Sequence, residues 1–411
     1  LQDLEFLRFN YQNTFVKDMW KNCYSGISRA NTAIAKIPEI KMNESKKNRL
    51  IAEARTLRAL YYFNLVRFFG DVPLILDLKT VEDSKGPRDS KELIYDQIIE
   101  DLTFAEEHLP LRSEYSASDE GRINKGAAKI LFGKVYLTKG DFQKAKDKLA
   151  EVVEHESEYG FGLHKDYHAN WLRDTEAGIE AVLYIEYKEP PFQHNGEMAL
   201  AGPKYSIPGS LGISALNEAD IPTQELYDQF DNRDLRKKTN FKTEFAHLKT
   251  GEILKSSIPL SGKFWVEGLE TGDRCDVNMH IIRYADAILM YAEALNEVGK
   301  STKALAMLNR IRERAFGDDS GNFKPMSKDE FRTAILNERR LEFPHEGHRW
   351  FDLVRTGTFI QRMKEHSAYE AKVAEANKTE IAQNIKEHMI LMPIPQSEID
   401  LNPNLVQNAG Y

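Results

Sequence analysis

Two stretches of this chain align with each other without a gap, and this internal repeat limits the possible folds more than any other feature. The first, AAKILFGKVYLTKGDFQKAKDKLAEVV, begins at Ala127, and the second, DAILMYAEALNEVGKSTKALAMLNRIR, begins at Asp286. Both carry a small residue, a large residue three positions later, a turn glycine (Gly140 or Gly299) and a second small residue. This spacing is typical of tetratricopeptide helical pairs, whose small residues let two helices approach closely. The repeat predicts a scaffold and does not indicate any chemistry.

Further amphipathic patterns extend this scaffold on both sides of a different middle region, where glycine, proline and aromatic residues are frequent and EAVLYIEYK alternates like a strand. We predict an all-α fold that forms a single unit over residues 1–411. Its first and second helical pairs occupy 15–155, and its third and fourth occupy 278–363. Residues 156–277 form a loop-rich, ligand-binding insert with a few short strands. Residues 364–411 form a C-terminal tail that packs on the scaffold.

Composition excludes several classes of function. The net charge of −8 is spread fairly evenly, so no basic face indicates nucleic-acid binding. No stretch approaches the roughly 20 apolar residues of a transmembrane helix. The two cysteines, Cys23 and Cys275, are too few for a disulfide framework or for a zinc site with about four ligands. We therefore expect no metal, no cofactor and no nucleic-acid partner.

The stretch NERRLEFPHEGHRWFDLVRTG, residues 337–357, concentrates acids, arginines and histidines as an active site would. A zinc-protease motif needs two histidines four residues apart on one helix, whereas His345 and His348 are three apart beside Pro344 and Gly347. The alternative is a helix end, a tight turn and a second helix start, held by ion pairs. Burial requires charged groups to be paired and hydrogen-bonded. We favour this structural interpretation over acid–base or metal chemistry at the carboxylates and histidines of the stretch, namely Glu342, His345, Glu346, His348 and Asp352.

Several blocks of the chain, in order, resemble the SusD/RagB family of glycan-binding surface lipoproteins from Bacteroidetes. They include AEARTLRALYYFNLVRFFGDVPLI, IPTQELYDQFDNRDLRKKT, RYADAILMYAEALNEVG, the histidine-containing stretch above and the C-terminal LMPIPQSEIDLNPNLVQNAGY. The resemblance covers nearly all of the chain. It implies a helical scaffold that binds an oligosaccharide outside the cell, without catalysis, and caps a SusC-like TonB-dependent transporter in the outer membrane.

The resemblance also implies an anchor. Family members normally begin with a lipidated cysteine and a segment that precedes the first long helix. Cys23 lies within an amphipathic helical pattern, so we do not expect it to carry the lipid. We expect attachment to the outer membrane, at the cell surface, through an N-terminal lipid ahead of Leu1.

Aromatic residues in loops are the candidates for sugar contacts, because sugar rings have flat apolar faces rimmed by hydroxyl groups. Such a ligand suits an aromatic platform with nearby amide groups. We expect Trp20, Trp350 and Trp171 to lie in the core. The RFNYQN segment precedes the first helix, where the family places part of its ligand site, and a long loop lies in the insert. The candidate ligand-binding residues are Tyr11, Asn13, Phe192, Asn195, Tyr205 and Trp265.

Two other functions stay open at this point. A tetratricopeptide-type scaffold that binds peptide or protein would hold its ligand along the helical groove. A glycoside hydrolase would need two suitably placed carboxylates, which any acidic chain contains. Only the sugar-binding interpretation expects contacts from both the segment before the first helix and the insert.

Overall fold

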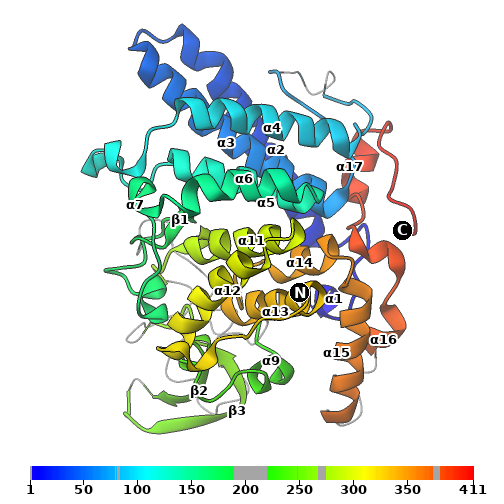
Figure 1. The fold of residues 1–411 in the computed structure, drawn as a ribbon. Coiled ribbons are helices and arrows are strands. Elements are labelled where there is room, and N and C mark those ends of the chain that lie inside the picture. The colour runs from blue at the N-terminus through cyan, green and yellow to red at the C-terminus, as the bar shows by residue number, and fades with distance from the viewer. Residues whose placement is uncertain are drawn as a thin grey trace. The chain divides into compact units, whose positions relative to one another are not determined.

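The computed structural model of the chain describes residues 2–78, 80, 84–188, 220–247, 249–266, 275–373 and 380–411. As predicted from the sequence, the fold is mostly helical, with a few short strands in two small sheets (Figure 1). Within these residues, no helix is both long and apolar enough to cross a bilayer. Contacts divide the chain into two compact units, described separately below: unit 1 comprises residues 1–139 and 353–411, and unit 2 comprises residues 140–352.

Unit 1 is built on three successive helix contacts: α2 packs on α3, α3 packs on α4, and α4 packs on α5. Asparagine and serine caps start these helices. Asn13 and Asn43 accept backbone N–H groups at the starts of α2 and α3, and Ser90 does so for α4. The helices of unit 1 are α1 (Gln2–Glu5), α2 (Thr14–Lys36), α3 (Glu44–Phe69), α4 (Lys91–His108), α5 (Lys125–Lys139), α15 (Phe359–Val373), α16 (Glu380–Asn384) and α17 (Gln396–Leu401).

The apolar side chains of α3 lie on more than one side of the helix, and not all of them are buried. The stripe through Ala54, Leu57 and Tyr61 is only partly covered, and Leu57 is 37% exposed. Since α3 packs against α2 and α4 together, its deeply buried residues lie on a wider face that includes Tyr62 and Phe63. Part of the apolar surface of α3, at Leu57 and Tyr61, is therefore left outside the core.

The C-terminal segment also belongs to unit 1 and is held there by hydrogen bonds. Met392 donates its N–H to the carbonyl of Phe68 at 2.7 Å, and the Asn408 amide donates to the carbonyl of Phe69 at 3.0 Å. Arg88 donates to the Asn408 side-chain oxygen at 2.6 Å. These bonds satisfy carbonyl groups at the end of α3 that would otherwise lack partners.

Unit 2 contains α11 at its centre, packed against α6, α12 and α13. The repeat predicted from the sequence is confirmed, because Gly140 and Gly299 have φ values of 80° and 78° at the turns, and the matching Ala145 and Ala304 are fully buried. The helices of unit 2 are α6 (Phe142–Val153), α7 (Glu156–Tyr159), α9 (Gln224–Asp228), α10 (Lys237–Asn240), α11 (Tyr284–Glu297), α12 (Ser301–Phe316) and α13 (Lys328–Glu342), and α14 (Arg349–Arg355) includes the boundary with unit 1.

The strands of unit 2 form two antiparallel pairs. Strand β1 (Ala181–Ile185) pairs with β4 (Met279–Arg283), and β2 (Phe241–Ala246) pairs with β3 (Ile253–Ser261). The strand predicted from EAVLYIEYK is therefore confirmed as β1. At Trp265 the chain turns, and the Trp265 N–H donates to the carbonyl of Gly262 at 3.2 Å. A side chain at Gly262 would lie 2.4 Å from the carbonyl of Thr239, so the backbone approach at this turn requires glycine.

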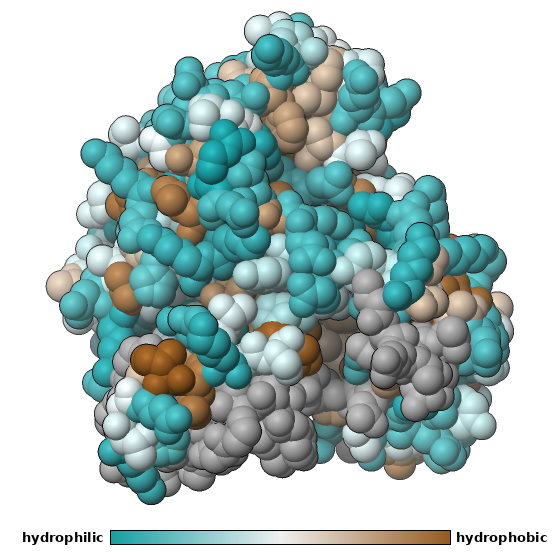
Figure 2. Space-filling model, turned by 90° about the horizontal axis from the view of Figure 1, so that it is seen from below, coloured by the Kyte–Doolittle hydropathy of each residue, from teal (hydrophilic) through white to brown (hydrophobic). Residues whose placement is uncertain are grey.

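Hydrophilic side chains cover most of the described surface in the view of Figure 2, and the hydrophobic ones lie in small separate groups. Scattered apolar residues of this kind are normal for a protein surface. On this face, particular side chains and grooves are therefore better candidates for a binding site than an apolar patch.

Candidate functional site

The segment before α2 presents exposed aromatic and amide groups, as the sequence predicts for part of a ligand site. Tyr11 is 39% exposed and Phe15, four residues later, is 45% exposed. Asn10 and Gln12, which flank Tyr11, are also exposed. Phe15 was missed in the sequence analysis, although its spacing from Tyr11 and its place beside the helix start could have indicated it.

Asn13 has a defined structural role in the same segment. Its side-chain oxygen accepts the N–H groups of Phe15 and Val16 at 3.1 and 3.3 Å, which caps α2. Only its amide N–H₂ group remains to donate to a ligand. Asn13 can therefore both hold the segment in shape and contribute one donor, but it cannot offer an acceptor.

Contacts within unit 1 fix the backbone of this segment. The Tyr11 carbonyl accepts the N–H of Gln396 at 2.8 Å. Phe9 is buried, and its ring lies 6.3 Å from the ring of Tyr411 at the C-terminal end. The exposed side chains of Tyr11 and Phe15 are thus carried on an anchored backbone, which lowers the entropy cost of ligand binding.

Trp265, a candidate from the insert, lies in unit 2 beside the β2–β3 pair. Its ring packs against Phe245 at a centroid distance of 4.7 Å, over a buried cluster that includes Tyr167, Trp171 and Phe264. Trp171, predicted to be a core residue, is 4% exposed, which confirms that prediction. Trp265 is only partly buried, so one part of its ring packs on this cluster and another part faces outward.

The remaining ligand-site candidates, Phe192, Asn195 and Tyr205, lie outside the described residues. Their assignment to a ligand site stays a prediction from the sequence. Of the predicted set, the structure brings Tyr11 and Asn13 together in one short segment of unit 1 and places Trp265 in unit 2.

The charged stretch at the end of α13 is a buried network of ion pairs, as the structural interpretation predicts. Glu342 is fully buried and accepts from Arg236, Arg283 and Arg314 at 2.9, 3.0 and 2.5 Å. Glu346 accepts from Arg283 at 2.7 Å. The network extends to five cations and five carboxylates, which are Arg236, Lys263, Arg283, Arg312, Arg314, Glu180, Asp234, Glu338, Glu342 and Glu346.

The electrostatics of this network are unsuited to general-acid chemistry. Burial alone would raise the pKa of Glu342, but the guanidinium groups of Arg314, Arg283 and Arg236 lower it below its usual value. The pKa of Glu346 is lowered in the same way by Arg283 and Lys263. A carboxyl that donates a proton near neutral pH needs a raised pKa instead. Both groups therefore serve as permanent anions.

Lys263 is enclosed by the same network. Its ammonium donates to Glu346 at 2.5 Å and to the carbonyl of Glu342 at 3.2 Å, and it lies 4.7 Å from the ring centre of Trp171. Desolvation lowers the pKa of Lys263 to about 8. This lysine joins the turn after β3 to the end of α13, so the charges hold the sheet and the helical array of unit 2 together.

The two histidines of the stretch do not converge on a common centre. His345 lies 3.3 Å from Asp220, whereas His348 lies 3.8 Å from Asp286. Asp352 accepts from Arg339 at 2.8 Å. Among the residues that the structure describes, no group of three or more histidine, cysteine or acidic side chains could hold a metal ion. The contacts of these residues are those of a helix corner.

Comparison with known proteins identifies the family. The model described as "SusD family" matches residues 257–411, and the model described as "Starch-binding associating with outer membrane" matches residues 6–137. A SusD-like protein of Formosa agariphila is 31% identical over 97% of this chain and 81% of its own length. The chain belongs to the SusD family. The predicted resemblance is thereby confirmed.

Solved structures of SusD relatives match the whole fold. A SusD superfamily protein from Parabacteroides distasonis has a TM-score of 0.83 at 28% identity, covering 100% of this chain and 89% of that one. A laminarin-binding SusD-like protein has a TM-score of 0.77 at 29% identity, covering 96% and 85%.

Proposed function

We propose that this SusD-family chain captures an oligosaccharide at the cell surface. The observation that carries the proposal is the match, over 96% of the chain, to a SusD-like protein that binds laminarin. The match of residues 6–137 to a starch-binding, outer-membrane-associated family supports the same class of ligand and place of action. The exposed aromatic and amide groups before α2 supply side chains of the kind that sugar rings require.

The proposed ligand contacts are Tyr11, with Phe15 beside it, the amide of Asn13, and Trp265 in the turn after β3. At these positions the aromatic faces stack on sugar rings, and the Asn13 amide donates to a hydroxyl group. Phe192, Asn195 and Tyr205 complete the proposed set from the sequence. No step of this function needs a cofactor, a metal or a reaction, and the buried carboxylates of unit 2 are committed to ion pairs.

The proposal continues with delivery of the bound oligosaccharide to a SusC-like TonB-dependent transporter, with attachment to the outer membrane through an N-terminal lipid. Support comes from the family and from the description of its members as associated with the outer membrane. A tagged chain incubated with outer-membrane extract of its native host should retain such a transporter, identified by mass spectrometry. Retention of only unrelated proteins would contradict this part of the proposal.

The ligand site is tested by calorimetry on Tyr11→Ala and Trp265→Ala, with Tyr11→Phe as the matched control. Truncation of a central aromatic anchor should cost about 2 kcal/mol, or roughly thirtyfold in affinity. Tyr11→Phe keeps the stacking face and should bind almost as the unmodified chain does. Affinity that is unchanged in both alanine variants would show that the oligosaccharide binds elsewhere.

A further inference from the structure

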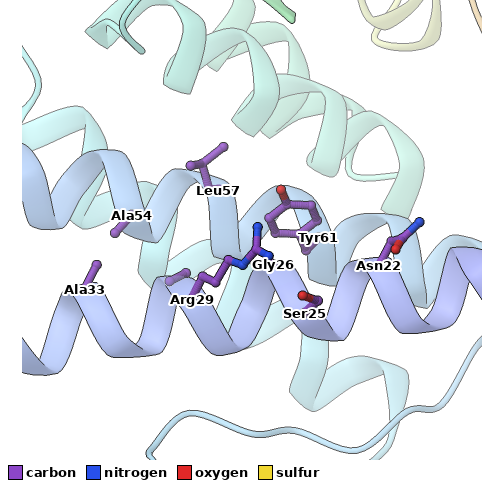
Figure 3. Close-up of a pocket in the computed structure, with 9 residues that line it drawn as sticks. Asn22, Ser25, Gly26, Arg29, Ala33, Ala54, Leu57 and Tyr61 are labelled. Carbon is purple, nitrogen blue, oxygen red and sulfur yellow. The ribbon is translucent and has the colours of Figure 1, made fainter. Parts of the chain in front are cut away.

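An open groove of about 480 Å³ runs between α2 and α3 in unit 1, and no residue predicted to contact a ligand lines it (Figure 3). Its lining combines two apolar side chains of α3, Leu57 and Tyr61, with small and polar residues of α2. The full lining is Asn22, Ser25, Gly26, Arg29, Ala30, Ala33, Ala54, Leu57 and Tyr61. This groove is the part of the apolar α3 stripe that the core leaves uncovered.

Tyr61 forms a fixed aromatic wall of the groove. Its ring lies directly on Gly26, where an added Cβ atom would come within 2.3 Å of a ring carbon. The glycine therefore lets the ring settle against the backbone of α2 while its other parts stay half-buried at the groove. An aromatic ring that is held in place by packing provides a stacking surface at little entropy cost.

Four polar groups at the groove lack partners within the part of the chain that the structure describes. The Arg29 guanidinium, the Asn22 amide and the hydroxyl groups of Ser25 and Tyr61 make no hydrogen bond or ion pair there. Figure 3 shows Arg29 reaching from α2 toward the side of α3 that carries Leu57 and Tyr61. Donors for a bound ligand are thus available on both helices.

The charge of the groove indicates which class of ligand would fit it. Arg29 is the one charged residue in the lining, and the lining contains no carboxylate, although the chain as a whole has a net charge of −8. A guanidinium matches a carboxylate or a sulfate with two parallel hydrogen bonds. A docked apolar helix would instead strip water from Arg29, Asn22 and Ser25 without replacing their hydrogen bonds, which is unfavourable.

We propose that the groove between α2 and α3 is a second saccharide-binding site, which takes an acidic sugar residue. The sugar ring lies against Tyr61 and Leu57, its acid group pairs with Arg29, and its hydroxyl groups meet Asn22 and Ser25. This inference rests on the proposed function, because it assigns a further site and a ligand class to the same capture of glycans.

The test is calorimetry of the full chain with trigalacturonic acid, its methyl ester, and a sulfated trisaccharide, which separates carboxylate from sulfate as the source of charge. We expect one of the two acids to bind and the neutral ester to bind at least tenfold more weakly. Arg29→Gln should lower the affinity for the acidic saccharide by roughly tenfold to a hundredfold, since it removes a charge-assisted hydrogen bond. Lys36→Gln is the matched control, because it removes one exposed positive charge from the same helix outside the groove.

A second variant tests the aromatic wall of the groove, and the melting temperature separates a loss of binding from a loss of folding. Gly26→Val should displace the Tyr61 ring and so lower the affinity for the acidic saccharide. Arg29→Gln changes only an exposed side chain and should leave the melting temperature unchanged, so that its loss of affinity does not come from unfolding. Equal binding of acid and ester, or full affinity in Arg29→Gln, would overturn the groove site. If the neutral glycans of the proposed function still bind in that case, that function stands. Failure of the chain to bind any saccharide would refute both.

Discussion

Replacement of Glu342 by glutamine should destabilise unit 2 more than any other single isosteric change within residues 337–357. The side chain keeps its shape and one acceptor oxygen but loses the negative charge that three buried guanidinium groups share, at 2.9, 3.0 and 2.5 Å. Five cations and five carboxylates balance in this network, so the variant leaves one uncompensated buried positive charge.

The size of the effect follows from burial. Breaking a buried ion pair from one side costs about 3–5 kcal/mol. For a unit of roughly this size, 1 kcal/mol corresponds to about 2–4 °C in Tm. We therefore expect Glu342→Gln to lower Tm by roughly 6–20 °C. Glu244→Gln is the matched control in the same unit: its pair with Lys255 is exposed and should contribute less than about 1 kcal/mol.

The pH dependence of this difference provides an independent check. The folded-state pKa of Glu342 is lowered, so its contribution is fully present above the unfolded value of 4.5 and is lost as the pH falls toward the folded pKa. Thermal unfolding followed by circular dichroism should show a constant gap between the unmodified chain and Glu342→Gln above about pH 6. The gap should narrow under acid. A gap that stays constant down to acid pH, or a loss of ligand affinity without a loss of stability, would refute this account of the network.

Three further predictions concern single sites. Asn13→Ala removes the cap of α2 and should lower the free energy of unfolding by about 1 kcal/mol, whereas Asn13→Asp should retain it, as chemical denaturation will show. Because Gly299 has a φ of 78°, Gly299→Ala should lower the free energy of unfolding by about 1 kcal/mol or more, and Gly299→Asn should lower it less; equal stability of both variants and the unmodified chain would contradict the turn assignment. Burial raises the pKa of Glu176 to about 7, so its stabilising effect is lost as the pH rises through that value. The free energy of unfolding of Glu176→Gln should therefore match that of the unmodified chain near pH 4 and exceed it by up to about 3 kcal/mol at pH 8; identical pH profiles would exclude this account.

The helical scaffold could be predicted because its determinants are local and periodic. Gly140 and Gly299 mark the same two turns in the sequence and in the structure, and the matching Ala145 and Ala304 are buried. Caps such as Ser90 and Ser327 also lie next to the helices that they start. Such features need no knowledge of distant parts of the chain.

The sequence predicted that the charged residues would form ion pairs, but it did not predict their partners. The acids of residues 337–357 were assigned to ion pairs, but their main partners lie far away in the sequence: Arg236 precedes α10, Arg283 ends β4, and Arg314 lies in α12. No periodic pattern links a strand end to a helix end. Which arginine meets which carboxylate is decided by how the elements of unit 2 pack, and sequence spacing does not contain that information.

Aromatic residues show the same limit at the candidate site. Trp171 and Trp20 were predicted to lie in the core and are buried, whereas Trp350 is only partly buried on the short helix α14. On α3, Leu57 and Tyr61 belong to an apolar stripe, but they line a groove. Helical periodicity identifies an apolar face, but the number and position of neighbouring helices decide whether that face is covered.

The central claim is that the chain binds an oligosaccharide and leaves it intact. A glycan microarray probed with the purified chain would identify the ligand, and mass spectrometry of that oligosaccharide after incubation and release would then give its length. The account predicts saturable binding and recovery of the ligand at its original mass. Binding to no glycan, or recovery of shortened products whose formation depends on one particular carboxylate of the chain, would contradict it.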